Sequence, residues 1–249
     1  MPFTLAHPAA VLPLLHKRLP FHFSVGLIIG SVAPDFEYFL QFRMASVGSH
    51  SLPGLFAFCL PISLLLAFAW FYVVSIPLTE NLPLFLRKRL CIHSDRKPGL
   101  TEWLSFAVGS LVGGATHLLW DSATHTGGYF VNQSPLLQQP IYGNQLPLFK
   151  ALQHISTIIG LAVVAFAIKN MPKQPVEEKP SRPPMANRFW LIVLLLSTFI
   201  FTSVSMVDPA SLSLKNLGYI AVRTISSILL ALLLACALTI ALKKSGRVS

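Results

Sequence analysis

Long hydrophobic runs dominate the chain and predict membrane-spanning helices. A helix needs about 20 apolar residues to cross a hydrocarbon layer of ~30 Å. Five runs meet this length: Gly54 to Leu78, Thr101 to Trp120, Leu148 to Ile168, Phe189 to Val207 and Leu217 to Leu242. A sixth, Phe23 to Phe42, is also long enough, although Asp35 and Glu37 interrupt its second half. The pattern predicts an all-α, polytopic membrane bundle of about six transmembrane helices.

The amino-acid composition excludes the ordinary soluble classes. Apolar residues make up 53% of the 249 residues and charged residues 11%, whereas a soluble globular domain has roughly 25% charged residues. The mean hydropathy of +0.64 also excludes disordered, collagen-like and disulfide-rich secreted chains. Three cysteines cannot all pair, so we expect reduced thiols. Lys17 and Arg18 follow the opening apolar stretch instead of preceding it, so we expect the N-terminus to be retained.

Loop charges predict which ends of the helices face the cytoplasm. The net charge is +10, and Lys and Arg gather in residues 87–97, in residues 169–188 and in the tail after Leu242. Ser122 to Pro147 contains neither. By the positive-inside rule, the basic segments and the C-terminus are cytoplasmic, and Ser122 to Pro147 faces outward from a bacterial inner membrane. Because topology explains the basic residues, they do not indicate nucleic-acid binding.

Prolines mark the expected domain boundary. Five prolines and mixed charges lie between Met171 and Pro184, a composition typical of an extended polar linker. We therefore expect a membrane-embedded domain at residues 1–170, a cytoplasmic linker at residues 171–188 and a two-helix membrane anchor at residues 189–249.

The N-terminus is expected to form a hairpin with the first span. If Leu5 to Leu19 is a short helix and Pro20 marks the turn, His7 lies 13 residues before the turn and Asp35 lies 15 residues after it. At ~1.5 Å of rise per residue, the two side chains reach nearly the same depth. The hairpin therefore brings His7 and Asp35 together, far from the cytoplasmic turn.

Histidines and carboxylates gather at the outer ends of the expected helices. His117 and Asp121 are four residues apart, so they share a helix face about 6 Å apart and can bind one ion. His50 precedes Ser51 and Pro53, a typical N-cap and first-turn pair. The candidate metal ligands are His7, Asp35, His50, His117, Asp121, His125 and His154.

Clustering distinguishes these residues from incidental histidines. A single histidine at a membrane interface is more often structural, and we assign that role to His16, His22 and His93. They fall on the cytoplasmic side and are expected to be solvated or to face lipid headgroups. Seven donors at one depth, in a chain with 9 acidic residues, instead predict one or two bound divalent ions. Mixed histidine and carboxylate donors suit zinc best, with manganese or iron as alternatives, better than magnesium or calcium.

Several motifs resemble a known family. The segments MPFTLAHPA, GSVAPDFEYF, SHSLPG, GGATHLLWDSATH and LQHIST resemble the bacterial membrane family called domain of unknown function 4184, over residues 1 to about 165. A more distant similarity is to membrane-bound metal-dependent hydrolases of the YdjM type, which share a PD element, a His-Ser element and an HxxxD element. The order His, Asp, His, HxxxD, His, His is also similar to that of zinc-dependent phospholipase C and the S1/P1-type nucleases.

The similarity to the zinc enzymes implies a helical multi-zinc site whose ligand order matches the seven candidate residues. Two positions depart from that pattern. The zinc enzymes use an N-terminal Trp, where this chain starts Met1-Pro2, and a Glu one turn after the last His, where Ile158 stands. A site of one or two ions therefore fits this chain better than a larger one.

The favoured function is hydrolysis of a phosphoester in a lipid or lipid-linked headgroup at the outer leaflet, with membrane lipids as partners. His50, His117 and Asp121 are expected to hold the principal ion, and His7 and His154 to complete a second or shared site. Asp35 is either a ligand or the catalytic base that orients the attacking water. A cation or proton transporter and a scaffold with a structural metal are the alternatives, and the oligomeric state stays open.

Overall fold

The computed structural model describes residues 3–15, 18–90, 98–141, 143, 145–175, 183–208 and 216–245. Across these residues the regular structure is helical, apart from one isolated bridge between Pro140 and Pro147. The predicted all-α class is therefore confirmed. Contacts divide the chain into two compact units. Unit 1 comprises Met1–Phe36, Val47–Leu65 and Pro98–Met171, and unit 2 comprises Glu37–Ser46, Leu66–Lys97 and Pro172–Ser249.

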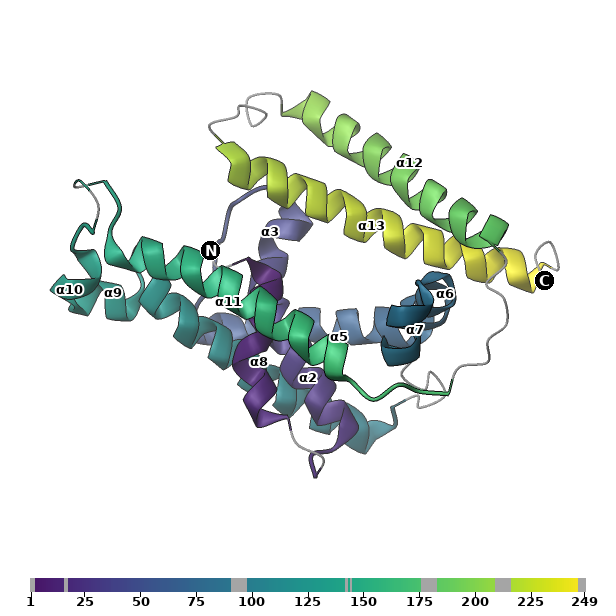
Figure 1. The fold of residues 1–249 in the computed structure, drawn as a ribbon, viewed down its shortest axis with the longest axis horizontal. Coiled ribbons are helices and arrows are strands. Elements are labelled where there is room, and N and C mark those ends of the chain that lie inside the picture. The colour runs from purple at the N-terminus through teal and green to yellow at the C-terminus, as the bar shows by residue number, and fades with distance from the viewer. Residues whose placement is uncertain are drawn as a thin grey trace. The chain divides into compact units, whose positions relative to one another are not determined.

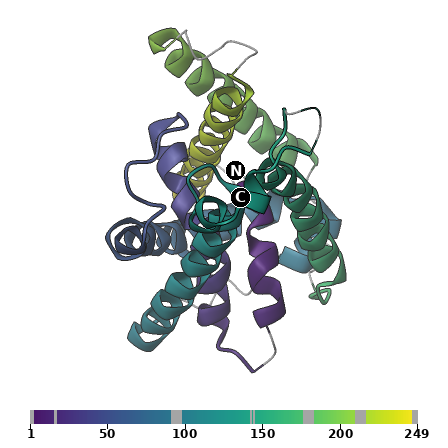
Figure 2. The ribbon, with the colours of Figure 1, turned by 90° about the vertical axis from the view of Figure 1, so that its left-hand side faces the viewer.

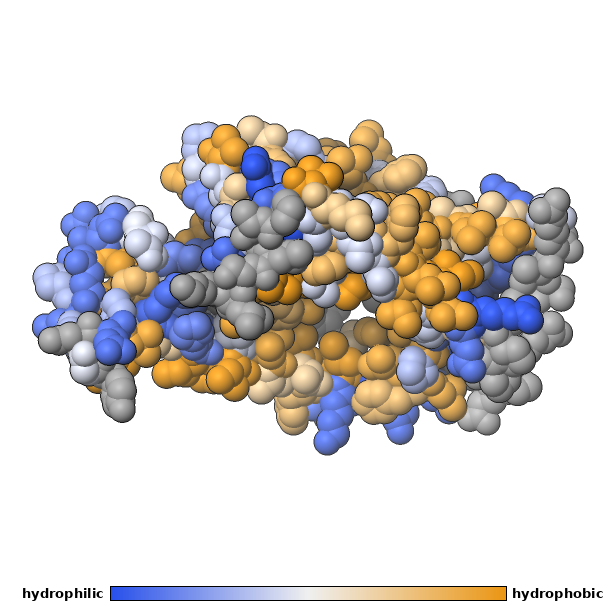
Figure 3. Space-filling view, turned by 90° about the horizontal axis from the view of Figure 1, so that it is seen from above, coloured by the Kyte–Doolittle hydropathy of each residue, from blue (hydrophilic) through white to orange (hydrophobic). Residues whose placement is uncertain are grey.

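Five helical segments are long and apolar enough to cross a membrane. They extend over Phe21–Gln41, Leu52–Asn81, Leu148–Asn170, Ala186–Val207 and Leu217–Lys244. Hydrophobic side chains cover much of the surface seen in Figure 3, as expected for a surface in contact with lipid. The prediction of a polytopic membrane bundle is confirmed.

The remaining expected span, Thr101 to Trp120, is more polar than the other five. It lies within α8 (Leu100–Thr124), which has 25 residues and is therefore long enough to cross a membrane. Its buried face lowers the hydropathy of the helix because most of the side chains on that face are small or polar. The buried residues are Phe106, Gly109, Ser110, Gly113, Gly114, His117, Asp121 and Thr124.

Unit 1 is built around α8 and α2 (Phe21–Val32), whose backbones touch at their glycines. A Cβ atom on Gly30 would lie 2.1 Å from the carbonyl oxygen of Ser110, and a Cβ atom on Gly113 would lie 2.2 Å from that of Leu27. No side chain fits at such distances, so glycine is what allows this close approach. The other helices that lie wholly in unit 1 are η1 (Thr4–Ala6), α1 (Pro8–Val11), η2 (Leu12–Leu14), η3 (Ala33–Asp35), α4 (Leu52–Gly54), η4 (Leu55–Cys59), α9 (Tyr129–Gln133), α10 (Pro135–Gln138) and α11 (Leu148–Asn170).

The predicted N-terminal hairpin is confirmed, although its first arm is less regular than expected. Prolines divide this arm into η1, α1 and η2, because proline has no N–H group to continue a helical ladder. The two arms meet where Thr4 Oγ1 donates a hydrogen bond of 2.6 Å to Asp35 Oδ2. Pro34 also interrupts the second arm after α2, so Asp35 lies at a break in the first span and faces protein.

In unit 2, α12 (Pro183–Val207) and α13 (Leu217–Lys244) lie side by side (Figures 1 and 2). Their shared core consists of Phe189, Val193, Ala231, Ala235 and Cys236. The other helices of unit 2 are α3 (Phe36–Gln41) apart from its first residue, η5 (Trp70–Val74), α6 (Ser75–Asn81) and α7 (Leu84–Leu90). The helix α5 (Leu60–Ala69) begins in unit 1 and ends in unit 2.

An ion pair between the buried Arg223 and the half-exposed Asp208 joins α13 to the C-terminal end of α12. Arg223 donates a hydrogen bond of 3.1 Å to Ser205 Oγ and lies 3.2 Å from a carboxylate oxygen of Asp208. Arg223 is 2% exposed, and an arginine inside a membrane helix is costly unless it is paired. The pair therefore accounts for the charge that α13 carries inside its span.

Packing divides the chain differently from the boundary expected at residues 171–188. Residues 37–46 and 66–97 belong to the same unit as α12 and α13. Trp190 Nε1, for example, donates a hydrogen bond of 2.9 Å to the carbonyl oxygen of Asn81. A functional division at the linker stays a prediction. Linker residues 176–182, together with His16, Cys91 and His93, lie outside the described residues.

Candidate metal centre

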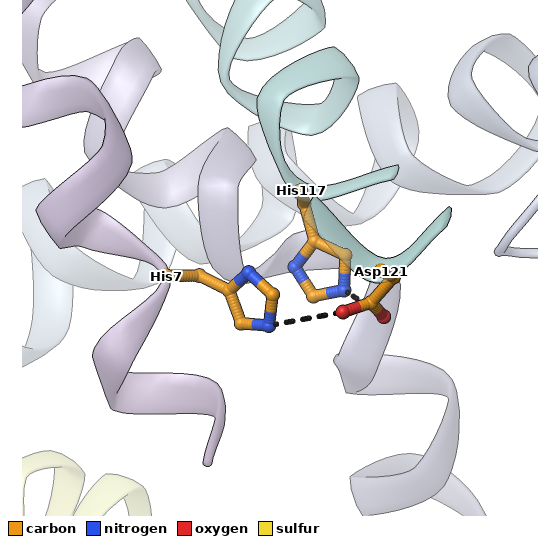
Figure 4. A group of neighbouring side chains, drawn as sticks. All are labelled: His7, His117 and Asp121. Atoms are coloured by element: carbon orange, nitrogen blue, oxygen red, sulfur yellow. Dashed lines mark ion pairs between the residues drawn. The ribbon is translucent and has the colours of Figure 1, made fainter. Parts of the chain in front are cut away.

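The C-terminal end of α8 brings the first candidate ligands together. His117 Nε2 lies 3.2 Å from Asp121 Oδ2, one helical turn away, as the spacing of four residues predicts. His7 Nε2, from the first arm of the hairpin, lies 3.5 Å from Asp121 Oδ1 (Figure 4). The imidazole rings of His7 and His117 are stacked, with their centroids 3.7 Å apart. Two elements far apart in sequence therefore converge on one carboxylate.

Asp35 and His50 extend this group. His50 stands just before α4, whose predicted N-cap is confirmed because Ser51 Oγ accepts a hydrogen bond of 3.1 Å from the Gly54 N–H. His50 Nε2 lies 3.3 Å from Asp35 Oδ1 and 3.6 Å from Asp121 Oδ2. His117 Nε2 lies 3.6 Å from Asp35 Oδ1. We call Asp35, His50, His117 and Asp121 the inner four residues.

Hydrogen bonds behind the inner four residues orient their donor atoms. His117 Nδ1 lies 2.7 Å from the carbonyl oxygen of Ser31, which only accepts, so this nitrogen carries the proton and Nε2 presents its lone pair. Thr4 holds the other oxygen of Asp35, and Ser49 Oγ lies 2.8 Å from His50 Nδ1. Supporting contacts of this kind are typical of metal ligands.

The buried donor atoms fit a divalent cation. His7, Asp35 and His117 are at most 1% exposed. Among the described residues, His7 Nε2, His117 Nε2, Asp35 Oδ1 and both carboxylate oxygens of Asp121 make no hydrogen bond of acceptable geometry. Burying carboxylates is unfavourable unless a cation or a donor compensates them. One or two bound divalent ions would satisfy these atoms.

The distances among the inner four residues match the size of a metal shell. Four ligands about 2.0–2.1 Å from zinc in a tetrahedron lie ~3.4 Å apart. The four histidine-to-aspartate distances within this set are 3.2, 3.3, 3.6 and 3.6 Å. Two overlapping groups have their ligand atoms within 4.8 Å of one another: His7, His117 and Asp121, and Asp35, His50 and His117. The overlap at His117 leaves room for one ion or two.

His7 and His125, the two histidines beside the inner four residues, stay neutral because they are largely buried. Burial lowers the pKa of His7 from 6.5 to about 3, and the neighbouring His117 lowers it further, against the opposing effect of the carboxylates. Burial likewise lowers the pKa of His125 to about 4. Neutral imidazole is the form that binds metals, so near pH 7 neither residue has to lose a proton to contribute.

His125 joins the group, whereas His154 does not. His125 Nδ1 lies 3.2 Å from Asp121 Oδ1, at the point where α8 ends. On α11, His154 is exposed and the preceding Gln153 is buried, with its Nε2 atom 3.2 Å from His125 Nε2. Successive helical residues point about 100° apart, so only one of these two neighbours faces the group. The expected ligand role of His154 therefore lacks support from its position.

A comparison with protein families confirms the predicted resemblance to the family of unknown function. The model of the family Domain of unknown function (DUF4184) matches residues 1–237. The chain belongs to this family. The DUF4184 match extends past the quoted motifs through the linker and most of α13, so both units contribute to the family domain. No curated protein and no solved structure matches the chain.

Sequence reasoning missed three groups that support the centre of this DUF4184 chain. They are the hydroxyl of Thr4, the carbonyl oxygen of Ser31 and the amide of Gln153. The sequence gives a weak indication of the role of Thr4, because Thr4 lies three residues before His7. It gives no indication of the role of a backbone carbonyl group. His22, which we expected to be solvated or to face lipid headgroups, is buried beside Phe21.

Proposed function

We propose that the chain is a membrane-embedded, metal-dependent hydrolase that cleaves a phosphoester in a lipid or lipid-linked headgroup. The observation that carries the proposal is the convergence of two histidines and two aspartates, the inner four residues, with His-to-Asp distances of 3.2–3.6 Å. Their order along the chain is similar to that of YdjM-type hydrolases and of zinc-dependent phospholipase C and S1/P1-type nucleases, which supports the same chemistry.

The inner four residues would hold the principal ion, for which zinc is the best fit and manganese or iron the alternatives. When bound, such an ion supplies Lewis acidity towards a phosphoryl oxygen and lowers the pKa of a water molecule to about 7. His7 lies on the opposite side of Asp121 from His50, as judged by the carboxylate oxygen that each histidine faces. His7 would therefore contribute to a second or shared metal site.

The position of Asp35 favours the ligand role over the base role. Its Oδ2 atom is occupied by the Thr4 hydroxyl, and its Oδ1 atom faces His50 and His117. The carboxylate is fully buried, and a general base must reach the proton that it removes. Asp35 thus has one free oxygen, and that oxygen points to the same place as the two histidines.

The segment after His125 supports a lipid substrate. Thr126 to Phe149 contains no Asp, Glu, Lys or Arg. Within it, α9 and α10 lie together next to the end of α8 (Figure 1). Large apolar side chains of this segment are exposed: Tyr129, Phe130, Leu136 and Ile141. An uncharged surface with aromatic side chains is typical of the membrane–water interface, where lipid headgroups lie.

A structural metal is the second candidate, because four protein ligands can close a tetrahedral shell. Catalysis needs an open position, and the partly exposed His50 side chain is where the centre approaches the surface. A transporter would require a polar path through the membrane, for which the apolar spans offer no comparable feature among the described residues.

Metal content and hydrolysis together test the proposal. Detergent-purified protein should contain about one or two zinc ions per chain and should release phosphate or a phosphorylated headgroup from phosphatidic acid or phosphatidylglycerol in mixed micelles. His117→Ala should lose both properties, whereas His154→Ala, on the exposed side of α11, should keep both. Metal without hydrolysis of either lipid would favour the structural metal, and native protein without metal would overturn the proposal.

We also propose that the centre faces the outer side of a bacterial inner membrane and that the C-terminus is cytoplasmic. The basic loops and the uncharged Ser122 to Pro147 segment support this orientation. In intact cells, a membrane-impermeant thiol reagent should modify a cysteine introduced by Asn132→Cys and leave Cys91 unmodified. Modification of Cys91 instead would place the centre on the cytoplasmic side.

A further inference from the structure

A chain of polar contacts leads outward from the centre through His125 to α11. Asp121 Oδ1 lies 3.2 Å from His125 Nδ1, and His125 Nε2 lies 3.2 Å from Gln153 Nε2. Gln153 is 1% exposed, so its amide is committed to the protein interior. Both nitrogen atoms of the His125 ring therefore have a defined neighbour.

The chemistry of these neighbours selects one tautomer of His125. The Thr124 hydroxyl donates to the carbonyl oxygen of Trp120, so towards His125 Nδ1, 3.2 Å away, it can only accept. Asp121 Oδ1 is a carboxylate oxygen and also accepts. Two acceptors thus face Nδ1, which must carry the proton. In a neutral ring Nε2 is then an acceptor, and it faces the amide nitrogen of Gln153, which can only donate.

The packing of α11 holds Gln153 in place. Thr157, one turn further along, accepts a hydrogen bond of 3.1 Å from the Phe3 N–H and donates one of 2.9 Å to the Gln153 carbonyl oxygen. Two turns along, a Cβ atom on Gly160 would lie 2.8 Å from the Cβ atom of Ala6. The same face of α11 is therefore fixed against the N-terminal segment that carries Thr4 and His7.

We propose that His125 and Gln153 are positioning residues. His125 donates through Nδ1 to Thr124 Oγ1, holds the Asp121 carboxylate through the 3.2 Å contact of Nδ1 with Oδ1, and is not itself a metal ligand. Gln153 holds the His125 ring in that tautomer. The inference rests on the proposed metal centre and changes the expected role of His125. With Nδ1 of His125 beside Oδ1 of Asp121, Oδ2 is left to face His50 and His117. Outer contacts of this kind typically contribute 10- to 100-fold to metal affinity.

An asparagine at position 125 separates the two roles of the histidine. Its side-chain N–H group can replace the Nδ1–H donor, but a neutral carboxamide is a poor zinc ligand. Zinc affinity is measured by chelator competition on metal-stripped full-length protein reloaded with zinc. His125→Ala and Gln153→Ala should weaken zinc binding roughly 10- to 100-fold while the number of ions at saturation is unchanged. His125→Asn should stay within about threefold of the native affinity, and His154→Ala is the matched control on α11.

Loss of the ion in His125→Asn, as complete as in His117→Ala, would make His125 a ligand and overturn the proposal. A second measurement does not depend on metal. In protein labelled with nitrogen-15 histidine and stripped of metal, the His125 resonances, assigned by their disappearance in His125→Asn, should report the Nδ1–H tautomer. The Nε2–H tautomer would overturn the inference. Native protein that binds no zinc but shows the Nδ1–H tautomer would overturn the proposed function and leave the Gln153–His125–Asp121 chain standing.

Discussion

Replacing Asp121 with asparagine should reduce bound zinc to background and eliminate phosphoester hydrolysis. The Asp121 carboxylate lies within 3.6 Å of four imidazole rings, those of His7, His50, His117 and His125. Asparagine has the same shape but no negative charge, and an ion that loses a charged ligand also loses its geometry. The affinity loss should exceed the roughly 100-fold that supporting contacts contribute. Elemental analysis after dialysis, together with chelator competition, measures it.

Asp35→Asn should have a nearly equal effect on zinc, because its free oxygen faces His50 and His117. If Asp35 were instead the base that orients water, the variant would retain zinc and lose only hydrolysis. Glu37→Gln is the matched control, since Glu37 is also a buried carboxylate of the first span but accepts a hydrogen bond from Ser46. A loss of zinc in the control as large as in Asp35→Asn would show that the losses report misfolding.

The second large effect should come from filling the contact between α2 and α8. In Gly30→Ala and in Gly113→Ala, the new Cβ atom would lie 2.1 or 2.2 Å from a backbone carbonyl oxygen. No rotamer change relieves such a clash, so the helices must separate, at a cost of about 3 kcal/mol for each change. The separation would also move Asp35, at the end of η3, which follows α2, away from His117 on α8.

Thermal unfolding in detergent, followed by the helical circular dichroism signal, measures the loss of stability, and zinc content reports the displaced ligands. Gly48→Ala is the control, because no atom lies within 4 Å of the position that its Cβ would occupy. A Gly30→Ala/Gly113→Ala double variant with native stability and full zinc content would contradict the direct backbone packing of α2 against α8.

The parts of the centre that the sequence predicts are those governed by local geometry. The spacing of His117 and Asp121, the hairpin that pairs the N-terminus with Asp35 and the Ser51 cap beside His50 all follow from helix periodicity and turn chemistry. Helix periodicity does not predict which of the neighbours Gln153 and His154 faces the centre. That choice depends on the rotation of α11 about its axis, which is set by contacts of Thr157 and Gly160 with residues more than 150 positions away.

The same limit applies to the partner of α8. From the sequence, Gly109, Gly113 and Gly114 indicate that some helix approaches closely, but the identity of that helix is decided by packing. Once α2 is the partner, Ser31 lies beside His117 and supplies the carbonyl oxygen that orients its ring. A backbone group of this kind leaves no trace in residue identity, so only the fold reveals it.

The order in which the ligands are synthesised has a consequence for biogenesis. The centre draws on residues 7, 35, 50, 117 and 121, and 70 residues of chain lie between His50 and Asp121. During translation the first span therefore enters the membrane while the Asp35 carboxylate still lacks the His117 imidazole. Until α8 arrives, that carboxylate must stay protonated or remain near the aqueous interface. If the proposed centre binds metal, capture would follow the insertion of α8, and a metal-loaded chain would be one in which α8 already lies beside α2.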